Sequence, residues 1–332
     1  MRRAALAGAL ALLVPAAPAA AKVGPLPVAA VPGAIWATDP SDAVVRFDPG
    51  NGHVTGTSEG IAAAWSLDAA DGGLWALEQG GRVVRAGPDG VAETAGRVAG
   101  IPHDLAVGRT SVWVLTYRGA RGGRAVLARL DRRSLRLRGL FHLGRRAAHL
   151  AAAGSRVWLA FDAVGPGRRG ALVVLDESSG SVRARLRLRG GVRDVAADAA
   201  GGWVVVERGP RPRIISVGAA DARPRWRVTA PAMTGHLAPA GDVLWVGTLC
   251  GGPDCRIDQA SVRALDAGSG RSVAGPYRTW RPCGGGTGGG PTLFPAGLTA
   301  TPAGAFATLG DGGPDLRVAH IGTEGVRWCA KV

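Results

Sequence analysis

Imidazole and carboxylate side chains at five positions are the strongest candidates for chemistry in this 332-residue sequence. They are His103, Asp104, His149, Asp194 and His236. Side chains of these types can ligate a divalent cation or transfer protons as general acids and bases. They lie far apart along the chain and lack a local metal-ligand spacing such as His-x-x-x-His, so only the fold can bring them together.

Residues 155–189 form the clearest copy of a unit that recurs along the chain. The apolar runs 156–161 and 171–175 have the length and composition of strands buried on both faces. Asp176-Glu-Ser-Ser-Gly180 predicts a turn, and 181–189 alternates with period two, as an outer strand with one solvent-exposed face does. Together with the short apolar run at 149–153, these segments predict a four-stranded antiparallel meander.

An aromatic residue opens the second predicted strand of each unit. The seven positions are Trp36, Trp75, Trp113, Trp158, Trp203, Trp245 and Phe306, with successive spacings of 39, 38, 45, 45, 42 and 61 residues. The turn after the third strand recurs in phase with them, at Asp48, Asp131, Asp176 and Asp266. A repeat of about 40–50 residues with four strands is typical of a propeller blade. We therefore predict an all-β, seven-bladed β-propeller with four antiparallel strands per blade. The last spacing is longer than the others, and we assign its extra residues to insertions around Cys250 and at 283–290.

Aligning the first strands of the units places six residues at one position. They are Ser66, Asp104, His149, Asp194, His236 and Gly297. In a propeller these strand starts line the central channel at one end, on the face that also carries the insertions 117–124, 162–169 and 248–256. A polar funnel of this kind can hold a ligand or a metal, and isolated polar groups there can equally be solvated by channel water. Trp65 precedes this position and is expected either to pack between blades or to serve as a platform for a ligand.

The segment Pro102-His103-Asp104-Leu105-Ala106-Val107, followed after a short turn by Ser111-Val112-Trp113, resembles the repeat of the virginiamycin B lyase-like and related secreted seven-bladed propellers. The resemblance extends over most of the chain and implies the propeller fold. It also implies lyase chemistry by a His and an acidic group with a divalent metal in the later blades, where His236, His320 and Glu324 are present. None of these three lies in a matching local motif, so we transfer no catalytic residue.

The first 21 residues have the pattern of a secretory signal. Met1-Arg2-Arg3 precedes an apolar stretch and small residues ending at Ala21, so we expect cleavage there and a single propeller domain over 22–332. The apolar stretch is too short to span a bilayer, and no later stretch approaches ~18 uninterrupted apolar residues. The sequence thus predicts a secreted or extracytoplasmic protein, which we expect to be a monomer without a transmembrane segment in the mature chain.

Four cysteines lie late in the chain, at Cys250, Cys255, Cys283 and Cys329. In an oxidising compartment an even count predicts disulfides. Only four residues separate Cys250 from Cys255, which favours a local bridge and leaves Cys283 to pair with Cys329. A four-cysteine metal site is the alternative, although the spacing is poor for zinc.

Arginine supplies nearly all of the basic charge. Removing Arg2 and Arg3 takes the formal net charge from +15 to +13, and alternation places Arg183, Arg185, Arg187 and Arg189 on one face of an outer strand. Such a face can block edge-to-edge pairing of strands, or bind cell-wall phosphopolymers, acidic glycans or anionic lipid. Nucleic acid is not expected, because no recognition motif occurs and no aromatic residues are interleaved with the arginines.

These observations favour a non-catalytic binding or interaction protein that uses the channel-mouth face. No nucleophile, base and orienting group can be named together, and no cofactor is expected. The partner is a small molecule, a glycan, an anionic cell-wall polymer or a protein. The alternative is a lyase or hydrolase that uses the five candidate residues with a divalent ion, and spatial convergence of those side chains is the observation that separates the two hypotheses.

Overall fold

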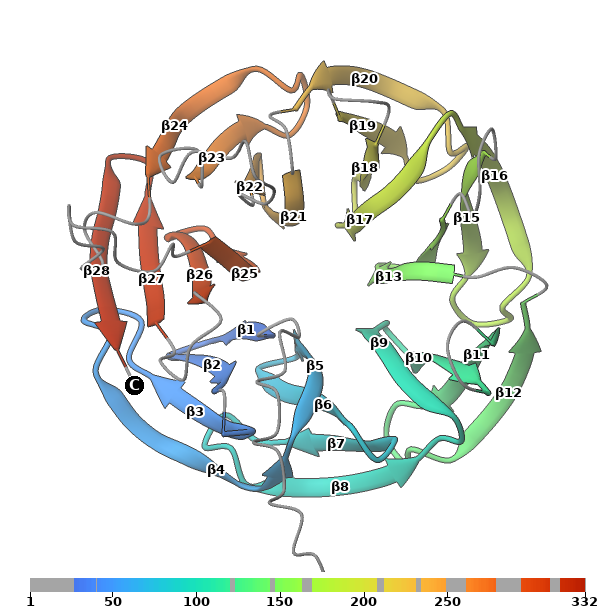
Figure 1. Cartoon of the computed structure of the whole chain (residues 1–332). Helices are drawn as coiled ribbons and strands as arrows, with labels where there is room; N and C mark the ends of the chain where they lie inside the picture. Colours follow the sequence, from blue (N-terminus) through green and yellow to red (C-terminus); the bar gives the residue numbers. More distant parts are fainter. Residues whose placement is uncertain are drawn as a thin grey trace, which may run out of the picture.

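The computed structural model describes residues 27–39, 41–119, 123–143, 147–162, 169–207, 212–230, 234–248, 261–278, 294–310 and 317–331. Seven antiparallel sheets of four strands stand in a ring, as Figure 1 shows, and each sheet is one blade built from consecutive chain. The described residues contain no helix, so none of them forms a helical membrane span. The predicted all-β seven-bladed propeller is therefore confirmed.

Each blade runs from an inner strand at the ring axis to an outer strand on the circumference (Figure 1). Blades 1 to 4 contain β1 (Val28–Val31), β2 (Ala34–Thr38), β3 (Ala43–Phe47) and β4 (Val54–Ala62); β5 (Ala64–Ala70), β6 (Gly73–Glu78), β7 (Arg82–Ala86) and β8 (Ala92–Arg97); β9 (Ile101–Val107), β10 (Ser111–Arg118), β11 (Arg124–Asp131) and β12 (Leu137–His142); β13 (Ala147–Ala153), β14 (Arg156–Phe161), β15 (Gly170–Asp176) and β16 (Val182–Leu188).

Blades 5 to 7 complete the ring. They contain β17 (Gly191–Ala197), β18 (Gly201–Glu207), β19 (Arg213–Gly218) and β20 (Pro224–Thr229); β21 (Thr234–Ala240), β22 (Val243–Thr248), β23 (Ser261–Asp266) and β24 (Ser272–Arg278); β25 (Phe294–Thr301), β26 (Gly304–Gly310), β27 (Arg317–Gly322) and β28 (Gly325–Lys331). The extra residues between Trp245 and Phe306 lie between β22 and β23 and between β24 and β25, as predicted.

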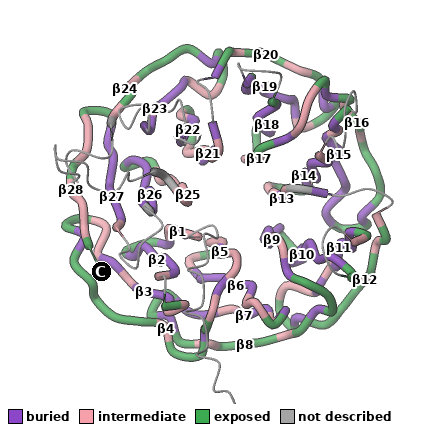
Figure 2. Tube along the Cα trace, viewed as in Figure 1, coloured by how far each residue is buried: buried purple, intermediate pink, exposed green. Residues whose placement is uncertain are grey.

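The core lies between neighbouring blades, since each core cluster joins residues of two adjacent sheets. The middle strands are mostly buried, whereas the outer strands are mostly exposed or half-buried (Figure 2). The seven repeated aromatic residues all lie in second strands and are at most 3% exposed. Truncating a buried residue of this size to alanine typically costs about 3–5 kcal/mol. The aromatic repeat is thus a packing repeat, and it sets the number of blades.

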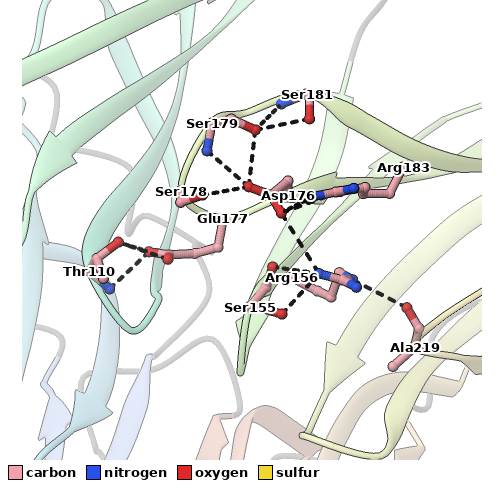
Figure 3. Close-up of polar contacts among 10 residues, drawn as sticks. All are labelled: Thr110, Ser155, Arg156, Asp176, Glu177, Ser178, Ser179, Ser181, Arg183 and Ala219. Atoms are coloured by element: carbon pink, nitrogen blue, oxygen red, sulfur yellow. Dashed lines mark hydrogen bonds and ion pairs between the residues drawn. The ribbon is translucent and has the colours of Figure 1, made fainter.

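The recurring Asp turn joins the third and fourth strands of a blade. In blade 4 the Asp176 carboxylate accepts hydrogen bonds from Ser178 Oγ (2.7 Å), Ser179 N (3.0 Å) and Ser179 Oγ (3.0 Å), and it also binds Arg183 (Figure 3). These donors hold the pKa of Asp176 well below its usual range. Asp48, Asp131 and Asp266 accept hydrogen bonds in the same way in their own turns.

The ring closes between blade 7 and blade 1 without exchange of a strand. Trp328 of β28 donates a hydrogen bond from Nε1 to the carbonyl oxygen of Pro49, at 3.0 Å. A core cluster joins Phe47 of blade 1 to Phe306 of blade 7, with Trp328 packed against it. Trp226 of blade 5 binds the Ala267 carbonyl in the turn of blade 6 at 2.9 Å, so the closing contact copies one made elsewhere in the ring.

Of the four cysteines, only Cys329 lies within the described residues. It belongs to β28 and is disulfide-bonded. Cys250, Cys255 and Cys283 lie outside the described residues, as does the predicted signal segment 1–21. The pairing of the cysteines and the cleavage at Ala21 therefore stay predictions.

Candidate functional site

Six of the seven inner strands carry a β-bulge at equivalent positions. The residue that lacks a partner in the second strand is Trp65, His103, Ala148, Arg193, Gly235 or Ala296. The next residue is in each case the one that the sequence alignment selected, namely Ser66, Asp104, His149, Asp194, His236 or Gly297. We call these six residues the axial cluster. A bulge bends its strand and redirects the side chains beside it, so the polar residues share a common local backbone geometry.

The two carboxylates of the axial cluster tie neighbouring blades together. Asp104 Oδ2 accepts a hydrogen bond from the backbone N–H of Leu150 in blade 4, at 2.8 Å. Asp194 Oδ2 accepts one from Leu237 N in blade 6, at 2.7 Å. Leu150 directly follows His149, and Leu237 directly follows His236. The two bonds therefore hold neighbouring inner strands together at their bulges.

Asp68 of β5 makes the same kind of contact and was missed by the sequence analysis. Its Oδ2 accepts a hydrogen bond from Val107 N of blade 3, at 2.8 Å, and its Oδ1 one from Ala69 N. Asp68 lies two residues beyond Ser66, outside the aligned position. The signal that could have found it is an Asp directly before an apolar residue in an inner strand, a pattern that Asp104 and Asp194 share.

Side chains of the axial cluster also contact one another across blades. Ser66 Oγ donates to Asp104 Oδ1 at 3.3 Å. His149 Nδ1 lies 3.8 Å from Asp194 Oδ1, with the two side chains 32% and 19% exposed. Asp104 and His236 are also half-buried, so the polar part of the cluster is enclosed by protein without being sealed from solvent.

Burial shifts both kinds of titratable group toward neutrality. It raises the pKa of Asp104 to about 7 and that of Asp194 to about 8, against the opposing effect of the backbone hydrogen bonds. It lowers the pKa of His236 to about 4 and that of His149 to about 3, the latter with help from the like charges of His103, His236 and Arg193. At neutral pH both imidazoles are uncharged, and each can donate one hydrogen bond and accept another.

His103 lies at a bulge, next to the axial cluster rather than in it. Its ring packs edge-on against Tyr117, with 4.8 Å between the ring centroids, and its carbonyl oxygen accepts a hydrogen bond from Trp65 Nε1 at 2.8 Å. Trp65 therefore makes a contact between blades, one of the two roles expected from the sequence. Tyr117 in turn binds the Ala147 carbonyl of blade 4 through its hydroxyl.

The metal hypothesis required several side chains to converge on one point. Within the part of the chain that the structure describes, no group of three or more His, Cys, Asp and Glu residues could hold a metal ion. His149 Nδ1 and Asp194 Oδ1 approach each other to 3.8 Å. The later-blade candidate His320 stacks on Phe306 at 4.4 Å between centroids and is buried, so its ring is part of the core of blade 7.

The insertions expected on the channel-mouth face are described only in part. Residues 120–122, 163–168 and 249–260 lie outside the described residues. The candidate site is therefore defined by the axial cluster and its neighbours on the inner strands.

Comparison with known proteins supports the fold. No family model matches the chain, and no curated protein matches it. Among solved structures it is similar to the crystal structure of BamB from Moraxella catarrhalis, with a TM-score of 0.50 and 17% identity, over 80% of this chain and 71% of that one. At this identity the similarity shows a shared propeller architecture and nothing about activity. The narrower resemblance to the virginiamycin B lyase-like propellers is not shown by these comparisons.

Proposed function

We propose that this protein is a non-catalytic propeller that binds a ligand at the axial cluster. The observation that carries the proposal is that Asp104, His149, Asp194 and His236 occupy equivalent bulge positions on the inner strands of four consecutive blades, where His149 Nδ1 lies 3.8 Å from Asp194 Oδ1. Polar groups gathered in a partly open, protein-enclosed site are what ligand sites typically present.

The state of these side chains favours binding over catalysis. Two of the four carboxylate oxygens of Asp104 and Asp194 accept backbone hydrogen bonds from the next blade, and two accept them from Leu105 and Val195. These contacts fix the orientation of the two carboxyl groups, of which Asp194, with a pKa of about 8, is largely protonated at neutral pH. With neutral imidazoles beside them, the cluster is suited to an uncharged polar ligand, such as a small molecule or a glycan.

The expected alternative, a metal-assisted lyase or hydrolase, receives no support from the described side chains. Lyase chemistry of the expected kind needs a divalent ion held by several ligands. Among the described residues, His149 and Asp194 form a pair without a third metal-binding side chain. We therefore retain the binding hypothesis.

We further propose that the mature chain begins after Ala21 and works outside the cytoplasm. The support is the basic start, apolar stretch and small-residue end of residues 1–21. The disulfide bond at Cys329 agrees with this location, because disulfides persist in oxidising compartments.

Histidine modification in the presence of native extracellular material tests the proposal. Diethyl pyrocarbonate labels accessible imidazoles, and mass spectrometry reports each site. We expect concentrated culture medium to protect His149 and His236 while leaving the exposed His53 and His142 labelled as in buffer. Equal labelling of all four histidines with and without the medium would contradict binding at the axial cluster.

A further inference from the structure

A groove lies between blades 4 and 5, beside the outer strands β16 and β20, and none of its described lining residues belongs to the axial cluster. It has a volume of about 380 Å³ and is bounded by β16 on one side and by β18, β19 and β20 on the other. In Figure 1, β16 and β20 follow one another on the circumference. This volume falls in the range of small-molecule sites, which is about 300–1,000 Å³.

The floor of the groove is apolar. Leu188 of β16, Val206 of β18 and Ile215 of β19 line it, and they are 2%, 4% and 8% exposed. All three belong to the core cluster that joins blades 4 and 5. The groove therefore opens directly onto core packing, and an apolar group that entered it would be removed from water.

The rim of the groove is cationic. Four of the described arginines line it, Arg187 and Arg189 from the outer edge of blade 4 and Arg213 and Arg227 from blade 5, and none of the described lining residues is acidic. Among the described residues, none of these guanidinium groups is in an ion pair or a side-chain hydrogen bond. Nearby arginines differ, since Arg183 binds Asp176 at 2.7 Å.

Protection of sheet edges does not account for this cluster. Arg187 and Arg189 lie at the outer strand of blade 4, where charge blocks edge-to-edge pairing. Arg213, however, lies on β19, the third strand of blade 5, which has a neighbour on both sides. Four like charges around one cavity repel one another, and a bound anion would relieve that repulsion.

We propose that this groove binds a phosphate ester that carries an apolar substituent. A phosphate offers several oxygens to the planar, forked donors of arginine, often in bidentate pairs. Its second ionisation, with a pKa near 6, adds charge at neutral pH. The apolar substituent lies on the floor formed by Leu188, Val206 and Ile215. This site is separate from the axial cluster and does not depend on the function proposed there.

Calorimetric titration of the mature protein with octyl phosphate, below its micelle concentration, tests the proposal. We expect one saturable site and at least about tenfold weaker binding to the double variant R213Q/R227Q, because each substitution removes charge-assisted hydrogen bonds to the phosphate. R133Q/R136Q removes the same charge from exposed arginines of the blade 3 turn and should bind as the wild type does.

Two further probes distinguish the parts of the ligand. Inorganic phosphate should bind more weakly than octyl phosphate, and octyl glucoside, which lacks the anion, should not compete. Equal weakening of binding in R213Q/R227Q and R133Q/R136Q would overturn the proposal, because it would show attraction to net charge alone. Absence of saturable binding, or inorganic phosphate binding as tightly as octyl phosphate, would also overturn it. H149A/H236A should leave this binding unchanged, which separates it from the axial cluster.

Discussion

The carboxylate of Asp194 in blade 5 accepts a hydrogen bond from the backbone N–H of Leu237 in blade 6, with 2.7 Å between oxygen and nitrogen. Burial nevertheless raises the pKa of this aspartic acid to about 8. In an unfolded chain the same group titrates near pH 3.9. Between about pH 4 and pH 8 the native state therefore holds a proton on Asp194 that the unfolded state has already released.

This difference predicts that the protein loses stability as the pH rises from about 6.5 to about 8.5. Asp194 and Asp104, with folded pKa values of about 8 and 7, bind more protons in the native state over this window. The neighbouring imidazoles of His149 and His236 have lowered pKa values and reduce stability only as the pH falls below about 6.5. Denaturant unfolding at a series of pH values measures the slope.

Asp194→Asn removes one titrating group and should flatten that slope, by at most about 1.4 kcal/mol per pH unit. Asp221→Asn, in an exposed turn, is the control and should keep the wild-type slope. A stability that rises between pH 6.5 and 8.5, or a D194N slope equal to that of the wild type, would show that the raised pKa is wrong.

The contact between Trp328 and Pro49 predicts that ring closure is as strong as an ordinary interface between blades. Trp328→Phe removes the donor at the closing interface, and Trp226→Phe removes the equivalent donor between blades 5 and 6. We expect each variant to lose about 1–2 kcal/mol of unfolding free energy, from one hydrogen bond and some packing.

Chemical denaturation followed by circular dichroism compares the two variants. We expect similar losses of unfolding free energy and a single unfolding transition in both variants. A second, early transition found only in W328F would mean that the ring opens between blades 7 and 1 before the blades unfold.

Glu177 links blade 4 to blade 3 by hydrogen bonds, so its truncation to alanine should lower the unfolding free energy substantially. Glu177 is only 2% exposed, and its carboxylate accepts hydrogen bonds from Thr110 N at 3.0 Å and Thr110 Oγ1 at 2.8 Å (Figure 3). It also accepts one from Ser111 N at 2.7 Å. Glu177→Ala should cost about 2–5 kcal/mol, because two backbone N–H groups lose their partner at about 1–3 kcal/mol each.

Thermal and denaturant unfolding of E177A measures this cost, with Asp221→Ala as a surface control expected to cost no more than about 1 kcal/mol, since Asp221 accepts one exposed hydrogen bond, from Arg223 N at 3.0 Å. Gly108→Ala gives an independent check, since a Cβ there would lie 2.7 Å from Glu177 Oε1. If E177A were as stable as D221A, the hydrogen bonds of Glu177 would contribute nothing to the stability of the interface between blades 3 and 4.

Much of the architecture could be predicted from the sequence because packing repeats with the blade. Trp158 and its six counterparts recur because every blade needs a large buried side chain at the same place, and Asp176 recurs because every hairpin needs the same turn. The alignment of Asp104 with Asp194 also located the axial cluster. The physical reason, a shared bulge one residue earlier, is a matter of backbone pairing that residue types do not reveal.

The contacts between blades could not be predicted in the same way. Asp68 binds Val107, and Arg213 lines the same groove as Arg187, only because the ring brings separate blades together. The spacing of residues along the sequence reports on one blade at a time and not on contacts between blades. The polar contacts and the groove depend on the angle between blades, which no local spacing records.

The axial cluster predicts a specific response to metals. Because no three metal-binding side chains converge there among the described residues, neither chelator nor added Zn²⁺ or Mn²⁺ should change the thermal midpoint of the wild type. Differential scanning fluorimetry measures this directly. Stabilisation by either ion that disappears in His149→Ala would revive the metal-assisted lyase or hydrolase hypothesis.

The affinity of the protein for the material that protects its histidines shows whether the axial cluster is a ligand site. The protecting fraction of culture medium, purified by size, is titrated into the wild type, into H149A/H236A and into the matched surface variant H53A/H142A. We predict at least about tenfold weaker binding to H149A/H236A, or about 1.4 kcal/mol, and wild-type binding to H53A/H142A. Equal affinity of all three proteins would contradict a ligand site at the axial cluster.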